Sequence, residues 1–77
     1  MDWKTENNSL VKEFVFQDFV QAVKFVNQIV PISEKANHHP NIYIHSYKMV
    51  RIELSTHSEV RITEKDYDLA AEIDRIK

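Results

Sequence analysis

The stretch NIYIHSYKMVRIELS, residues 41–55, decides the fold, because apolar and polar side chains alternate along it in two runs. Alternation with a period of two is typical of a strand with one buried face. The runs 42–47 and 50–55 therefore predict two strands. Only a few residues around Lys48 separate the runs, so we expect them to pair antiparallel across a tight turn.

Upstream, apolar residues recur every three or four positions and predict a long helix. Asp18 can cap its first turn, with Gln21 three residues later in the capping-box pattern. Pro31 interrupts the pattern, because a proline inside a helix loses the bond to the carbonyl of Asn27, at a cost of about 3 kcal/mol. We expect a kink between Asn27 and Pro31, or a break with a restart at Ser33. The predicted apolar stripe consists of Phe19, Ala22, Val23, Val26, Ile29 and Val30, with Phe25 and Ile32 off it.

Three further elements complete the chain. Residues 9–16 fit a strand, and the Asn-Asn pair at 7–8 indicates a turn from a short partner strand in residues 1–6. Thr63 and Asp66 have capping-box spacing and open a second helix. Its apolar face consists of Leu69, Ala70, Ile73 and Ile76. The order strand, strand, helix, strand, strand, helix predicts an α+β fold, in which a four-stranded antiparallel sheet carries both helices on one face.

Residues 1–77 are expected to form a single small domain. A core of that size gives marginal stability, and the chain has no cysteine for disulfides, so oligomerisation is the expected supplement. The first long helix is apolar over more than one face. One face can cover the sheet while another meets a second subunit.

Composition also excludes several functions. The net charge of -2 argues against direct nucleic-acid binding. The chain has no apolar run long enough for a membrane span and no signal-peptide core, so we expect a cytoplasmic protein without membrane association. The absence of cysteine excludes thiolate metal sites and thiol nucleophiles. Because glycine is also absent, we expect few residues with positive φ.

Three of the four histidines are predicted to meet at one edge of the sheet. His38 and His39 precede the first strand of the hairpin, and His57 follows the second strand. Because the two strands are antiparallel, the start of one lies beside the end of the other. Imidazole exchanges protons near neutral pH, so such a cluster suits acid–base catalysis. Spacing alone leaves a solvated loop and, with less support, a metal site as alternatives, and it leaves the position of His45 open.

Three other residues are candidates for the same region. Glu34 lies one helical turn before His38, where its carboxylate can hold a ring nitrogen or form a plain surface pair. Asp66 follows His57 by a short loop, and is expected either beside the histidines or as a helix cap. Trp3 offers a flat apolar face on which a ligand ring can stack, or it packs in the core or in an interface.

Three segments together resemble the pterin-4a-carbinolamine dehydratase family: EKANHHP at 34–40, YKMVRIELSTH at 47–57 and TEKDYDLAAEID at 63–74. FVFQDFVQAVKFV, residues 14–26, is similar to the strand-to-helix segment of that family. The resemblance implies dehydration of 4a-hydroxytetrahydropterin to quinonoid dihydropterin and water, in tetrahydrobiopterin recycling, without a metal or cofactor. It also implies a pterin substrate and a homodimer or homotetramer.

The resemblance further implies the site residues, with His38, His39 and His57 as the catalytic histidines. Our hypothesis for their roles makes His39 the principal acid and base, His57 an aid to hydroxide departure, and His38 an orienting group. The implied substrate-binding residues are Asn37, His38, His39, Ser55, Thr56, His57 and Ser58, and the implied supporting residues are Glu34, Asp66 and Trp3.

The chain departs from the family pattern in three ways. The N-terminal helix of the family is expected to be missing here. The hairpin is one residue longer around Ser46, which indicates a β-bulge. The sequence SEVRI after His57 replaces a loop that commonly contains glycine. The alternative function is a non-catalytic dimerisation or scaffold protein that binds a partner through its apolar first helix.

Overall fold

The structure, a computed structural model, describes residues 2–76 and confirms the predicted α+β fold with its six elements in the expected order. The elements are β1 (Lys4–Glu6), β2 (Ser9–Val15), α1 (Phe19–Ala36), β3 (Asn41–His45), β4 (Met49–Leu54) and α2 (Glu64–Ile76). Met1, which the first predicted strand included, lies outside the described residues. Within the described part of the chain, neither helix combines the length and the apolar character of a membrane span.

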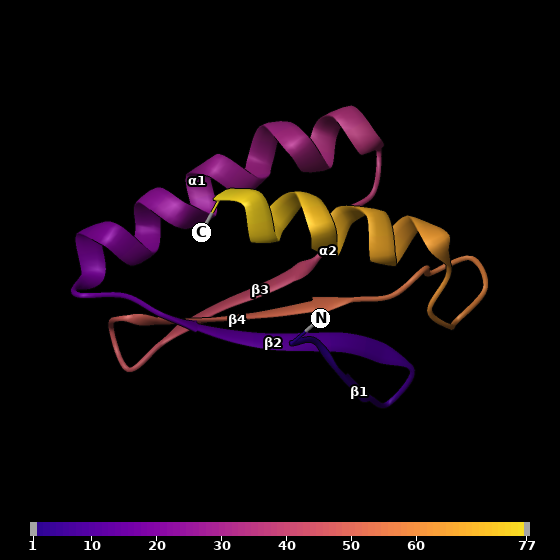
Figure 1. Cartoon of the computed structure of the whole chain (residues 1–77), viewed down its shortest axis with the longest axis horizontal. Coiled ribbons are helices and arrows are strands. Elements are labelled where there is room, and N and C mark those ends of the chain that lie inside the picture. The colour runs from indigo at the N-terminus through magenta and orange to yellow at the C-terminus, as the bar shows by residue number, and fades with distance from the viewer. Residues whose placement is uncertain (1, 77) are drawn as a thin grey trace.

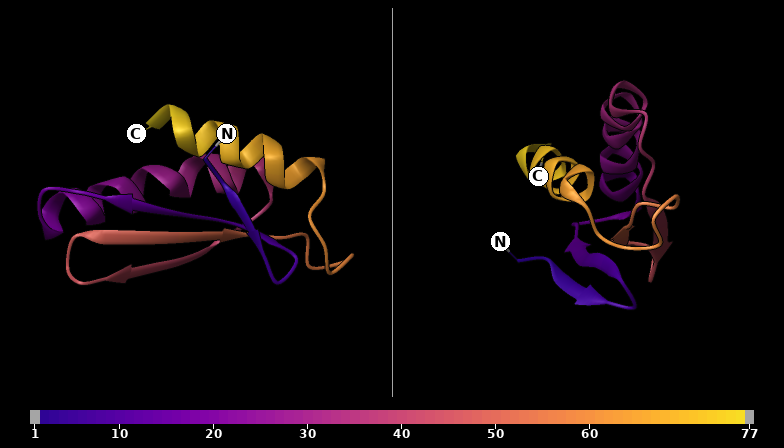
Figure 2. Two further views of the ribbon diagram at one scale, coloured as in Figure 1. Left: turned by 60° about the horizontal axis from the view of Figure 1, so that its bottom comes forward. Right: turned by 90° about the vertical axis from the view of Figure 1, so that its right-hand side faces the viewer.

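The four strands form one antiparallel sheet in the order β1-β2-β4-β3. Both helices lie on one face of this sheet (Figure 1), and the end-on view in Figure 2 shows them side by side. α1 runs toward the end of the sheet where β3 begins, and α2 runs back from that end (Figure 1). The end of α1, the start of β3, the end of β4 and the start of α2 therefore meet at one end of the molecule.

The β3–β4 hairpin has no β-bulge in its paired strands, although one was predicted around Ser46. Its pairing is regular along β3 up to the pair His45–Met49, so neither strand contains an extra residue. Ser46 and Tyr47, the last residues of the predicted first strand, lie in the turn instead, with φ of 50° and 53°. The two strands keep the faces that their alternation predicted.

Left-handed backbone is more frequent than the sequence suggested. Within residues 2–76, the residues with positive φ are Asn7, Asn8, Asn37, Ser46, Tyr47 and Val60, so the expectation of few such positions was wrong. Asparagine tolerates this region because its short side chain bonds locally. Val60 is different, because a β-branched residue is strongly disfavoured there.

α1 runs without interruption through Pro31, so the predicted break and restart at Ser33 is wrong. Its start is capped as predicted, since the side chain of Asp18 accepts a hydrogen bond of 2.9 Å from the N–H three residues later. Pro31 and Asn27 both lie on the exposed side of the helix. Water can therefore bond to the carbonyl of Asn27 that the proline leaves without an N–H donor.

The face of α1 that packs on the sheet differs from the predicted stripe. Phe25, predicted to lie off the stripe, is buried, with its ring centroid 4.8 Å from that of Phe14 and 4.9 Å from that of Phe16. Phe19 and Val30, predicted to lie on the stripe, are 54% and 52% exposed. Contact with the two phenylalanines on and after β2 therefore sets the rotation of α1.

Candidate active site

The histidine-bearing segment begins where α1 ends in a Schellman motif. Asn37 takes the left-handed conformation (φ 51°, ψ 43°), and its N–H donates to the carbonyl of Glu34. The N–H of His38 donates to the carbonyl of Ser33, which is the longer bond of that motif. Pro40 then follows, which cannot continue a helix. Asn37 thus has a structural role at a position where a substrate contact was predicted.

His38 and Asp66 form a buried pair. His38 Nε2 lies 2.5 Å from Asp66 Oδ1, and the two residues are 9% and 0% exposed. Because an ionised carboxylate only accepts hydrogen bonds, Nε2 of His38 carries the donated hydrogen. Nδ1 is then the nitrogen that remains available for another partner. The structure therefore places Asp66 beside a histidine of the predicted cluster.

Two threonines complete the bonding of Asp66. Its Oδ2 accepts from the backbone N–H of Thr63 at 2.9 Å and from the hydroxyl of Thr56 at 3.0 Å. The hydroxyl of Thr63 lies 2.7 Å from that of Thr56, so it donates to Thr56 when Thr56 donates to Asp66. The bond from the Thr63 N–H is half of the predicted capping box. Asp66 therefore caps α2 and holds His38 with the same carboxylate.

His39 has a separate partner. Its Nε2 lies 2.5 Å from Glu34 Oε2, and the two side chains are 57% and 68% exposed. Glu34 was expected to contact His38, and the structure corrects this expectation. The turn that ends α1 sends the two consecutive rings to different sides of the helix terminus, so only His39 comes within reach of Glu34.

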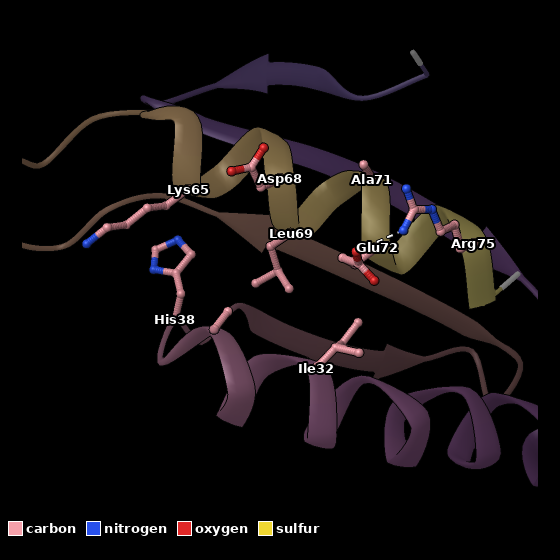
Figure 3. Close-up of a pocket in the computed structure, with 9 residues that line it drawn as sticks. Ile32, His38, Lys65, Asp68, Leu69, Ala71, Glu72 and Arg75 are labelled. Atoms are coloured by element: carbon pink, nitrogen blue, oxygen red, sulfur yellow. Dashed lines mark hydrogen bonds and ion pairs between the residues drawn. The ribbon is translucent and has the colours of Figure 1, made fainter.

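The two rings accordingly line different cavities. His38 lines a groove of about 480 Å³ between the end of α1 and α2, which Figure 3 shows. In that view Lys65 and Leu69 of α2 lie on one side and Ile32 of α1 on the other. The remaining lining residues are Ala36, Asp68, Ala71, Glu72 and Arg75. His39 lines a smaller slot of about 170 Å³ between α1 and β3.

His57 lies at the same end of the sheet but is exposed and lines neither cavity. Its neighbour Thr56 pairs with Arg61 through an N–H to carbonyl bond of 2.9 Å, which closes the loop that carries His57. Val60 in this loop has φ of 52°, at a cost of about 1–2 kcal/mol. Thr56 and Asp66 thus join the histidine-bearing segments, although the three rings do not share one cavity.

The other predicted substrate contacts differ in exposure. Ser55 is half-buried, and Ser58 is exposed next to His57. Neither serine side chain forms a hydrogen bond within residues 2–76. Both hydroxyls are therefore available to a ligand at this end of the sheet.

Trp3 lies far from the histidines along α2. Its indole N–H donates to Asp74 at 3.1 Å, and its ring packs edge-on against Phe14 at a centroid distance of 6.0 Å. Asp74 is roughly 12 Å further along α2 than Asp66. Trp3 is also only 8% exposed. This placement favours the core-packing alternative over a stacking wall for a ligand.

The fourth histidine, His45, lies on the open face of the sheet, which is the face that the two helices do not cover. His45 Nε2 lies 2.7 Å from Glu13 Oε1. Arg51 on the same face binds Glu53 and Glu6, and these hydrogen bonds raise the pKa of its guanidinium above the ordinary value. Within residues 2–76, no group of three or more ligand-type side chains has a geometry suited to a metal ion.

Two parts of the site were absent from the predicted set. Thr63 was expected only as a helix cap, yet its hydroxyl bonds to that of Thr56. The capping-box spacing between Thr63 and Asp66 was the sequence signal from which Thr63 could have been predicted as a site residue. Ile32 was predicted to lie off the apolar stripe of the first helix and Leu69 on the apolar face of the second, and no sequence signal indicated that they would line a groove between the helices.

Comparison with known proteins supports the resemblance over nearly the whole chain. A profile of the family described as pterin 4 alpha carbinolamine dehydratase matches residues 1–76. A relative from Sulfolobus acidocaldarius, provisionally named as a pterin-4-alpha-carbinolamine dehydratase, is 47% identical over 75 residues, which cover 97% of this chain and 81% of the relative. A relative from Chloroflexus aurantiacus with the same provisional name is 45% identical over 75 residues, covering 97% of this chain and 80% of the relative.

Solved structures show the same fold. The crystal structure of a transcriptional coactivator/pterin dehydratase from Brucella melitensis matches with a TM-score of 0.89 and 33% identity, covering 96% of this chain and 80% of that one. A pterin dehydratase-like protein identified as a RuBisCO assembly factor in the alpha-carboxysome matches with a TM-score of 0.75 and 25% identity, covering 96% and 84%. By sequence and by fold, this chain belongs to the pterin-4a-carbinolamine dehydratase family.

Proposed function

We propose that this protein dehydrates 4a-hydroxytetrahydropterins to quinonoid dihydropterins. The observation that carries the proposal is the bonded cluster in which Asp66 joins the segment of His38 to that of Thr56 and His57, in a member of this family. The proposal includes tetrahydrobiopterin recycling, which the resemblance implies, and the cytoplasmic location that was expected from the composition.

The reaction requires two proton transfers and no change of oxidation state. The C4a–O bond of the substrate breaks, and the hydroxyl leaves as water after it receives a proton. N5 loses its proton as the double bond between C4a and N5 forms. Imidazole suits both transfers, because its unperturbed pKa of about 6.5 lies close to neutral pH.

We assign the main acid–base role to His39, supported by Glu34. A carboxylate on one ring nitrogen fixes the tautomer and leaves the other nitrogen, Nδ1, to exchange the proton. His57 forms no hydrogen bond within residues 2–76, so its ring is free to assist the departure of the 4a-hydroxyl group as water. His38 is held by the buried Asp66 and suits the positioning of the substrate ring.

The proposal is tested by following the ultraviolet absorbance of a 4a-hydroxytetrahydropterin as purified protein dehydrates it. We predict that the wild type exceeds the spontaneous rate, and that His39→Ala lowers the catalysed rate about 100-fold or more. His45→Ala is the matched control, because His45 also pairs with a glutamate but lies on the open face of the sheet.

A wild-type rate equal to the spontaneous rate would refute the dehydratase function. Full activity in His39→Ala, with the function itself confirmed, would refute only the role of that histidine. Loss of activity in both histidine variants would indicate a general structural effect rather than a specific acid–base role.

A second candidate function is non-catalytic assembly. α1 exposes Phe19, Val20 and Val30 at 54%, 70% and 52%, and one structural neighbour is identified as a RuBisCO assembly factor. Large apolar side chains on one helix suit self-association, in the homodimer or homotetramer that the resemblance implies, or a partner helix. Light scattering measures self-association. Co-purification of a stoichiometric partner with a protein that lacks dehydratase activity would favour binding of a partner helix.

A further inference from the structure

Ser33 carries a buried hydroxyl that the fold leaves without a partner. It lies in the last turns of α1, is 3% exposed, and its Oγ forms no hydrogen bond within residues 2–76. Burial of an unbonded hydroxyl is unfavourable, and buried polar groups in proteins usually have a partner. Alanine would fill the same position in the helix without this cost, so the hydroxyl requires an explanation.

Ser33 lines the slot of about 170 Å³ between α1 and β3. The apolar walls of the slot are Ile29, Val30, Pro40 and Ile42. Its polar residues are Ser33 and the hydrogen-bonded pair of Glu34 and His39. Apolar walls with a few polar groups that fix orientation are the usual composition of a small-molecule site.

The volume of the slot limits what it can hold. It exceeds the roughly 30 Å³ that one water molecule occupies in the liquid. It is smaller than the roughly 300–1,000 Å³ of complete small-molecule pockets. The slot therefore has room for one edge of a ligand, and its aliphatic walls suit a flat ring with a polar atom on that edge.

We infer that the slot receives one edge of the bound pterin ring and that the hydroxyl of Ser33 forms a hydrogen bond with a polar atom of that edge. The inference rests on the proposed function and adds a substrate-binding residue to it. His39 lines the same slot, so a ring seated there contacts the proposed acid–base group. The Ser33 side chain has one rotatable bond, and a single staggered step about χ1 redirects its oxygen.

Ser33→Ala tests this inference in two measurements, calorimetric binding of 7,8-dihydropterin and dehydratase kinetics. The dissociation constant and KM should each rise about fivefold to tenfold, as expected for one lost hydrogen bond, while kcat stays within about twofold. The unliganded variant should melt at the same or a higher temperature, because alanine removes the unbonded hydroxyl. Ser9→Ala, a half-buried serine at the start of β2, is the matched control and should change neither constant.

The possible outcomes separate this inference from the function on which it rests. Unchanged affinity in Ser33→Ala, with a wild type that binds dihydropterin, overturns the inference and leaves the dehydratase function intact. A lower melting temperature with unchanged affinity also overturns it, because the hydroxyl would then serve the fold. A folded wild type that neither binds dihydropterin nor dehydrates the substrate would refute both the role of Ser33 and the dehydratase function.

A second variant tests the slot itself. Val30 is 52% exposed at the slot, so a larger side chain there leaves the core intact. Val30→Trp should weaken binding of 7,8-dihydropterin by partly filling the slot, with an unchanged melting temperature. Wild-type affinity in Val30→Trp would show that the ring binds elsewhere.

Discussion

Asp66 serves three neighbours with a single carboxylate. It accepts hydrogen bonds from His38, from the hydroxyl of Thr56 and from the N–H of Thr63. The end of α1, the end of β4 and the start of α2 are therefore tied to one fully buried group. A buried carboxylate is unfavourable without such donors, so the arrangement is stable only when all three segments are in place.

We predict that Asp66→Asn lowers the free energy of unfolding by about 2–4 kcal/mol, because an amide cannot accept hydrogen bonds from all three donors. Urea unfolding followed by circular dichroism measures the change. Glu64→Gln, at an exposed position in the same first turn of α2, is the control and should cost less than about 1 kcal/mol. Wild-type stability in Asp66→Asn would show that this carboxylate does not hold the three segments together.

Among the elements, α1 shows how tertiary contacts override a local signal. Pro31 predicted either a kink or a break with a restart at Ser33, and the helix runs through it without a break. Phe25 before the proline is buried against the sheet, and the Schellman bonds beyond it fix the end of the helix. The roughly 3 kcal/mol that an internal proline costs is thus offset by packing and capping.

Pro31→Ala should raise the free energy of unfolding by about 1–2 kcal/mol. Alanine restores the N–H for the carbonyl of Asn27, and part of this gain is lost because the unfolded chain becomes more flexible. Thermal unfolding measures the change. Asn27→Ala is the matched control, since it improves helix propensity by about 0.5 kcal/mol without restoring the bond. Destabilisation by Pro31→Ala would mean that the proline ring makes a packing contact on which α1 depends.

At the scale of the whole molecule, a polar cluster joins the N-terminal segment to the last turns of α2. Asp74 accepts hydrogen bonds from the Trp3 indole at 3.1 Å and from Lys12 Nζ at 2.8 Å. Lys12 Nζ also lies 4.8 Å from the centroid of the Phe14 ring. Since Asp66 fixes the start of α2, these contacts fix its other end, and the helix is held to the sheet at both ends.

We expect Asp74→Asn to lower the free energy of unfolding by about 1–2 kcal/mol, because Lys12 loses its closest counter-charge in a partly buried position. Trp3 is the single tryptophan, so its fluorescence reports on this end of the molecule during denaturation. Asp68→Asn, at an exposed position of the same helix, should leave stability within about 0.5 kcal/mol of the wild type. Equal effects of the two variants would show that the cluster contributes no specific stability.

Features that depend on residues close in the chain were predictable from the sequence, and features that depend on distant contacts were not. Strand alternation in residues 41–55 and the capping residues Asp18 and Asp66 depend on neighbours close in the chain. The structure has these elements in the predicted order and close to the predicted positions, although the first strand of the hairpin ends at His45. The rotation of α1 was not predictable in this way, because the helix is apolar on several sides. Only contact with Phe14 and Phe16 selects the side that carries Phe25.

The same distinction applies to the candidate site. The sequence by itself determined that the histidine-bearing segments meet at one end of the sheet, because an antiparallel hairpin brings the start of one strand beside the end of the other. Only the tertiary structure decided which carboxylate each ring contacts and which cavity it lines. Those outcomes depend on the turn at Asn37 and on the packing of α2, which places Asp66 beside His38 and leaves Glu34 to His39. Packing between segments distant in the chain fixes such contacts, and a periodic sequence pattern carries no information about them.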